Sequence, residues 1–154
     1  MTSVASVIAA IDMRRPGLTP AKQRLLLFFV QGHHLGWFDE PLFPEALQAT
    51  ERDVAVEVPT PAAAAAIDSE RPLNTIGYVT TRYSALSPSD LRTLVQASTP
   101  WQLARKSATG ARIDHGWLRD WFRRPDETDD PDDERPNRAE VAEVEAYLAT
   151  RGPR

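Results

Sequence analysis

Two adjacent histidines, His33 and His34, are the residues of this chain that most readily suggest chemistry, because imidazole serves both as a metal ligand and as a general base. They lie in the most apolar stretch of the sequence, LLLFFVQGHHLGWF, which covers residues 25–38. Neighbouring residues on an α-helix point about 100° apart, whereas efficient helical zinc ligands are four residues apart. Asp39 and Glu40 would add oxygen ligands only if the chain folds back. We therefore interpret both histidines as structural residues.

Other reactive constellations are missing from the sequence. It contains no nucleophile elbow, no phosphate-binding loop and no dinucleotide fingerprint, and it has no cysteine. The third histidine, His115, is remote in sequence from the first two. We predict no catalytic residue, no metal site, no cofactor and no enzymatic activity. A small hydrolase centred on His33, His34 and Asp39 is the least favoured alternative.

The charge of the chain is unevenly distributed. Its 154 residues carry a net charge of −4, but the segment DETDDPDDE at 126–134 alone contributes −7, which leaves the remainder at +3. Such a body is mildly basic and lacks the concentrated basic face of a dedicated nucleic-acid binder. No apolar run approaches the roughly 18 residues of a membrane span, and the N-terminus is a poor signal peptide. We expect a cytoplasmic protein with no membrane or nucleic-acid partner.

Hydrophobic periodicity and capping residues predict a chain of short helices. An apolar face formed by Val4, Val7, Ile8 and Ile11 predicts the first helix, which Pro16-Gly17 ends. Thr19 and Pro20 have the pattern of an N-cap and first turn, so a second helix follows. Its residues 25–30 are all apolar, which places this helix at the centre of the core.

The later segments vary in clarity. Residues 53–58 alternate valines and indicate a short strand without an evident partner, and Thr60 precedes a short alanine helix. Residues 73–86 fit either a strand or a helix, and we favour a helix with Asn74 as its cap. Three further helices are expected after the caps Ser87, Thr99 and Asp114. The last of these carries Trp117, Leu118, Trp121 and Phe122 on one stripe.

The C-terminal part differs in composition from the rest. Residues 123–137 are rich in Asp and Pro and predict an acidic flexible linker, and residues 138–150 predict an amphipathic helix with Val141, Val144 and Leu148 on one side. The fold class expected is mainly α: a single compact multi-helix domain over residues 1–122, with at most a minor β element.

Three blocks of the sequence resemble the Panacea antitoxin domain family, the phage-associated SocA-like proteins. The first block is LTPAKQRLLLFFVQGHHLGWFDEPLF, the second LRTLVQASTPWQLARK and the third IDHGWLRDWF. The chain departs from the family pattern in four places: His33 replaces a tryptophan, a Trp-x-Tyr-Gly-Pro-Val segment after PLFPEA is absent, the connecting region before the second block is short, and the acidic tail is extra. The matching residues are Leu18, Thr19, Pro20, Lys22, Leu26, Leu27, Phe28, Gln31, Gly32, His34, Leu35, Pro41, Leu42, Phe43, Leu91, Leu94, Pro100, Trp101, Ala104 and Arg105.

The resemblance implies a protein that binds and neutralises a cognate toxin by direct contact, or that delivers the toxin to a protease as an adaptor. The oligomeric state stays open. The alternative function is a helical DNA-binding transcriptional regulator. The candidate partner-binding residues are Gln31, His34, Trp37, Phe43 and Trp101. Trp37 follows Gly36 at a helix end, where an aromatic side chain can be half exposed, so we expect a partner contact there.

Overall fold

The computed structural model of the protein describes residues 2–57, 65–107 and 110–123. The expected mainly α fold is confirmed: the described residues form mostly helices, with a small two-stranded antiparallel sheet that packs against α2 and α5. No helix in the described part of the chain is long and apolar enough to cross a membrane. The elements are α1 (Val4–Arg14), α2 (Pro20–Phe38), β1 (Ala46–Ala49), β2 (Val54–Glu57), α3 (Glu70–Tyr83), α4 (Pro88–Ala97), α5 (Thr99–Lys106) and α6 (His115–Arg123).

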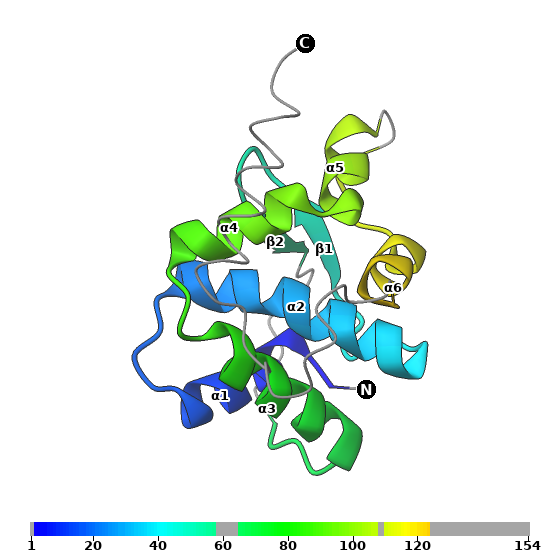
Figure 1. Ribbon diagram of the computed structural model, residues 1–154. Helices are drawn as coiled ribbons and strands as arrows, with labels where there is room; N and C mark the ends of the chain where they lie inside the picture. Colours follow the sequence, from blue (N-terminus) through cyan, green and yellow to red (C-terminus); the bar gives the residue numbers. More distant parts are fainter. Residues whose placement is uncertain (1, 58–64, 108–109, 124–154) are drawn as a thin grey trace.

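Helix α2 is the central element of the fold. It packs against α1, α3, α4, α6 and β2, and Figure 1 shows it running through the middle of the molecule. Every residue from 25 to 30 is buried, as the all-apolar run predicts. The start of the helix is also as predicted, because the Thr19 Oγ1 atom accepts a hydrogen bond from the Lys22 amide at 3.2 Å.

The predicted strand is present at β2, and β1 is the partner that the sequence does not reveal. The two strands pair with Leu47 opposite Val56. A third segment extends this pairing, since the Ile113 amide donates to the Leu47 carbonyl at 2.8 Å and the Ala49 amide donates to the Ala111 carbonyl at 2.7 Å. The sequence of β1, ALQA, contains no β-branched residue, so its composition does not favour a strand.

Two predicted N-caps are wrong, by five residues for α3 and by one residue for α5. Helix α3 is confirmed as a helix but begins at Glu70 after Ser69, so Asn74 lies inside it. Pro72 falls in the first turn, where a missing N–H leaves no hydrogen bond unmade. Helix α5 has Ser98 rather than Thr99 as its N-cap.

The other two predicted caps are confirmed. The Ser87 Oγ atom accepts from the Asp90 amide at 3.1 Å, and the Asp114 Oδ1 atom accepts from the Gly116 amide at 2.7 Å. Arg123, expected to begin the acidic linker, is instead the last residue of α6. The rest of the linker, the helix predicted at 138–150 and most of the alanine segment lie outside the described residues.

Helix α6 reaches α2 at two glycines. A Cβ atom built on Gly32 would lie 2.1 Å from Cε2 of Phe122, and one built on Gly36 would lie 3.3 Å from the Phe122 Cβ. Only a residue without a side chain permits the first approach. The Arg123 Nε atom then donates to the Gly36 carbonyl at 2.9 Å. These contacts fix the end of α6 beside the C-terminal half of α2.

Candidate partner-binding surface

Gln31 and Phe43 are buried and belong to the interior of the domain. The Gln31 side chain is 1% exposed and bridges backbone groups: its Nε2 donates to the Phe43 carbonyl at 2.9 Å and its Oε1 accepts from the Leu42 amide at 2.7 Å. The Phe43 side chain is fully buried. Gln31 therefore fastens the segment that follows α2 to the helix itself, and neither residue presents a surface to a partner in this structure.

His34 is also buried, at 2% exposure. Its Nδ1 lies 2.8 Å from Oγ1 of Thr75, and this hydroxyl donates to the Arg71 carbonyl at 3.0 Å. Nδ1 of His34 is therefore the donor to Thr75. Burial lowers the pKa of His34, which keeps the ring neutral. His34 thus holds α2 to α3, as a structural residue of the core.

His33 packs among aromatic rings, at the position where the family pattern has a tryptophan. Its ring centroid lies 4.6 Å from that of Phe122 and 5.2 Å from those of Tyr78 and Trp37. Its Nε2 lies 2.9 Å from the Tyr83 hydroxyl. Burial, and then the positive charge of Arg82, lower the pKa of His33 to about 3.

Asp39, the third residue of the alternative hydrolase site, turns to another partner. Its backbone is left-handed, with a φ of 57°, and its Oδ1 accepts from Nη1 of Arg119 at 3.1 Å. In the part of the chain that the structure describes, no cluster of three or more His, Asp or Glu side chains could hold a metal ion. The hydrogen bonds of His33, His34 and Asp39 thus lead to three different partners.

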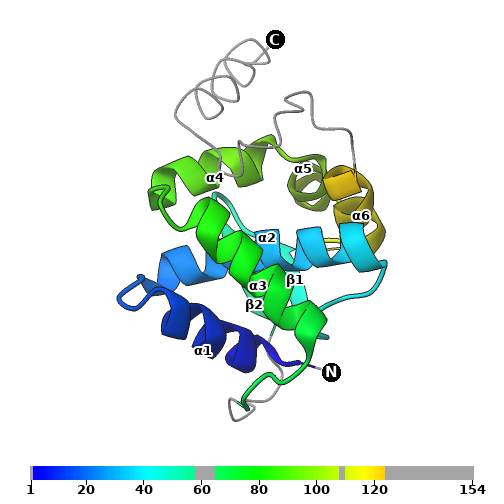
Figure 2. The ribbon, with the colours of Figure 1, turned by 60° about the horizontal axis from the view of Figure 1, so that its bottom comes forward.

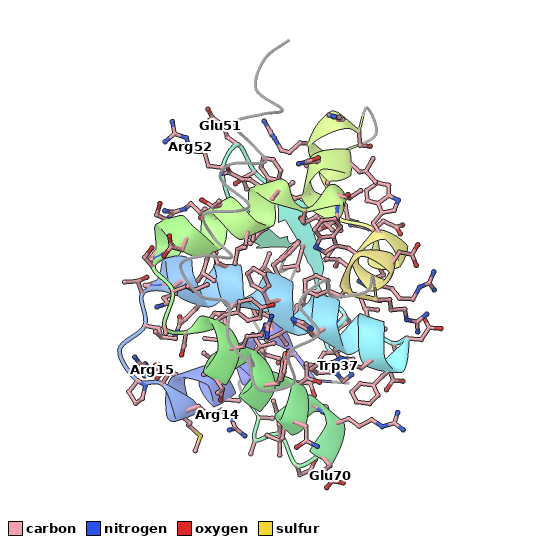
Figure 3. The ribbon with its side chains drawn as sticks, viewed as in Figure 1. Arg14, Arg15, Trp37, Glu51, Arg52 and Glu70 are labelled. Atoms are coloured by element: carbon pink, nitrogen blue, oxygen red, sulfur yellow. The ribbon has the colours of Figure 1, made fainter. Side chains whose placement is uncertain are left out.

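Trp37 is exposed, in agreement with the prediction. Its side chain is 46% exposed at the end of α2 (Figure 3). The ring does not project alone into solvent, because its centroid lies 4.9 Å from that of Tyr78 in an edge-on arrangement and 6.3 Å from that of Phe38. A large aromatic side chain is thereby held in place on a support of other rings.

Two arginines flank these rings. The guanidinium of Arg82 lies 5.9 Å from the centroid of Tyr78, and that of Arg71 lies 4.9 Å from the centroid of Phe38. Both distances fall within the range of cation–π contacts. We call the set of Trp37, Phe38, Tyr78, Arg71 and Arg82 the aromatic platform.

A shallow groove continues from the aromatic platform between α1 and α3, which lie side by side in Figure 2. It has a volume of about 280 Å³. A Cβ on Gly77 would lie 3.1 Å from the guanidinium of Arg14, so the arginine rests directly on the glycine. We call it the α1–α3 groove, and its lining residues are Arg14, Leu73, Asn74, Gly77, Tyr78 and Thr81.

Trp101 lies elsewhere and is partly buried. Its Nε1 donates to the Asp53 carbonyl at 2.9 Å, and the guanidinium of Arg105 lies 6.0 Å from its ring centroid. This hydrogen bond attaches α5 to the turn between β1 and β2. Helix α5 is at the end of the molecule away from α1 and α3 (Figures 1 and 2), so the fold does not bring Trp101 to Trp37.

Comparison of the chain with known protein families, with curated proteins and with solved structures gives no match. Sequence reasoning missed Tyr78, Arg71 and Arg82. A signal existed in the spacing of Tyr78 and Arg82, which are four residues apart and share a helix face, but it required α3 to be assigned as a helix with its start at Glu70.

Proposed function

We propose that this chain is a protein-binding module and that the aromatic platform is its contact surface. The observation that carries the proposal is the exposed Trp37, held on Tyr78 and Phe38 between two arginines. Tryptophan, tyrosine and arginine are the residues most enriched among those that dominate binding energy at protein interfaces. A ring that is already positioned by its neighbours also loses little conformational freedom on binding.

The resemblance to the Panacea family supports a finer proposal, namely that the partner is a toxin that this chain neutralises. Blocking by direct contact requires a surface that remains accessible in the folded domain, and Trp37 supplies it. Most of the other residues of the first resembling block lie inside α2 or the buried segment after it, where they form the scaffold that presents Trp37.

The proposal is tested with the protein encoded by the neighbouring reading frame. That protein should be toxic when expressed alone and tolerated when it is expressed with this chain. Trp37→Ala should abolish protection and weaken the complex by about 30-fold or more, as expected for loss of a dominant contact. Leu103→Ala is the matched control, because Leu103 is an apolar side chain of similar exposure, 39%, on α5.

The possible results separate the two levels of the proposal. Equal protection by the Trp37 and Leu103 variants would refute the aromatic platform as the contact surface. A harmless neighbour that forms no complex would refute the antitoxin function. Salt-sensitive binding of the purified protein to duplex DNA would instead favour the transcriptional regulator, because phosphate contacts release counterions. A fall in the amount of toxin, with no stable complex, would indicate delivery to a protease.

A further inference from the structure

The chain leaves the described domain beside the aromatic platform. Helix α6 ends at Arg123, and the Nε atom of this residue donates to the Gly36 carbonyl at 2.9 Å. Gly36 directly precedes Trp37. Phe122 also lies against His33, one turn before Trp37 on α2, with 4.6 Å between ring centroids. Whatever follows Arg123 therefore starts next to the exposed tryptophan.

The sequence after Arg123 is long enough to return to this surface. Residues 124–137 form the predicted linker, and a chain of this length spans roughly 20 Å as a flexible coil and up to roughly 40 Å when proline and like charges extend it. A segment tethered by such a linker experiences an effective concentration of the order of millimolar at nearby sites. Even a weak intrinsic affinity of residues 138–150 for the domain would then give a largely docked state.

The chemistry of residues 138–150 complements the aromatic platform and the α1–α3 groove. On a helix, Val141, Val144 and Leu148 would form one apolar stripe. The same segment carries three glutamates and one arginine, so it is net acidic: the charged residues are Arg138, Glu140, Glu143 and Glu145. The surface offers apolar area at Trp37, Tyr78 and Leu73 between arginines of α1 and α3.

We propose that residues 138–150 of this chain dock as a helix in the α1–α3 groove and over Trp37, and that a partner must displace them. This regulation rests on the proposed function of the aromatic platform, since it makes the C-terminal segment an internal competitor for that surface. A segment docked nine-tenths of the time lowers the apparent affinity for a partner about tenfold, because only the undocked fraction binds.

The absence of cysteine from the sequence allows a direct test with the full chain. A nitroxide attached to Ala146→Cys, on the side of the predicted helix away from the apolar stripe, should broaden the NMR signal of the Trp37 indole N–H. The Trp101 signal should remain sharp and serves as the internal control. Val141→Asp combined with Leu148→Asp should restore the Trp37 signal. Trp37→Phe assigns the signal.

A sharp Trp37 signal in the labelled protein would overturn the proposal. A second sample mixes isotope-labelled protein without nitroxide and unlabelled protein with nitroxide. Broadening of the Trp37 signal in this mixture would place the helix on a second copy, which also contradicts docking within one chain. Neither experiment needs a partner, so a failure of docking is distinguishable from a failure of the proposed function.

The regulatory step is tested separately by partner binding. The double variant with Val141→Asp and Leu148→Asp should bind the partner about tenfold more tightly than the unaltered chain does. Weaker binding would show that the apolar stripe contacts the partner itself and would refute its role as a competitor. If docking is observed but Trp37→Ala does not affect the partner, the proposed function fails while the docked state stands.

Discussion

Replacement of Gln31 by alanine should be among the most destabilising single changes in this protein. The side chain is 1% exposed and satisfies the Phe43 carbonyl and the Leu42 amide with bonds of 2.9 and 2.7 Å. Gln31→Ala removes both partners while these backbone groups stay buried. Each buried polar group without a hydrogen bond costs about 1–3 kcal/mol, and the side chain leaves a cavity as well.

The freedom that the glutamine side chain loses on folding offsets part of this loss, by about 1–2 kcal/mol. The expected net decrease in the free energy of unfolding is therefore about 3–5 kcal/mol. Domains of this kind are stable by only about 5–15 kcal/mol, so the variant should unfold at a urea midpoint lower by about 1.5–2.5 M for an m-value near 2 kcal/mol per molar.

Urea denaturation followed by far-UV circular dichroism measures this change. Gln23→Ala, on the same helix but partly exposed, is the matched control and should shift the midpoint little. Gln31→Glu keeps an acceptor for the Leu42 amide, but its carboxylate would be buried against the Phe43 carbonyl, so its loss should be at least as large as that of Gln31→Ala. A decrease below 1 kcal/mol for Gln31→Ala would show that the segment after α2 rearranges to satisfy its own backbone, and would refute this account.

Three further changes probe other contacts. Burial holds the pKa of His33 at about 3 against 6.5 for the ordinary side chain, so between these pH values the unfolded state binds one proton more than the folded state. The free energy of unfolding should therefore fall by up to about 1.4 kcal/mol per pH unit as the pH drops from 6.5 to 3. Urea titrations at several pH values measure this slope, which His33→Phe should flatten. Gly32→Ala should destabilise by about 1–2 kcal/mol, because overpacking against Phe122 exceeds the gain in helix propensity, and Phe122→Leu should relieve the loss in a double-mutant cycle. Thr19→Ala should cost about 0.5–2 kcal/mol in thermal or urea unfolding, through loss of its cap on the Lys22 amide, and an unchanged stability would contradict that role.

The parts of the fold that the sequence predicts are those specified by local chemistry. The caps Thr19, Ser87 and Asp114 act within a few residues of their own position, and the run at 25–30 needs only its own hydrophobicity to indicate a buried helix. Strand β1 is not predictable from the sequence, because its stability comes from pairing with β2 and with residues 111–113. Such pairing depends on segments distant in sequence, and the composition of ALQA alone does not indicate it.

The same distinction holds for the candidate site. The exposure of Trp37 could be inferred from its position after Gly36 at a helix end. Sequence similarity marks Gln31 and Phe43 as candidate contact residues, but it does not tell whether their side chains face solvent or the core. Their burial, and the contact of Tyr78 with Trp37, follow from the packing of α3 on α2 and are visible only in three dimensions.

The close contact of Phe122 with Gly32 has a consequence for synthesis of the chain. The α2 face around Gly32 pairs with a helix that lies near the end of the domain in sequence, so during translation this face stays uncovered until α6 has left the ribosome. The nascent chain therefore exposes part of its most apolar helix for most of its synthesis. Chaperone binding to the growing chain should be strongest at α2 and should be released once Phe122 emerges.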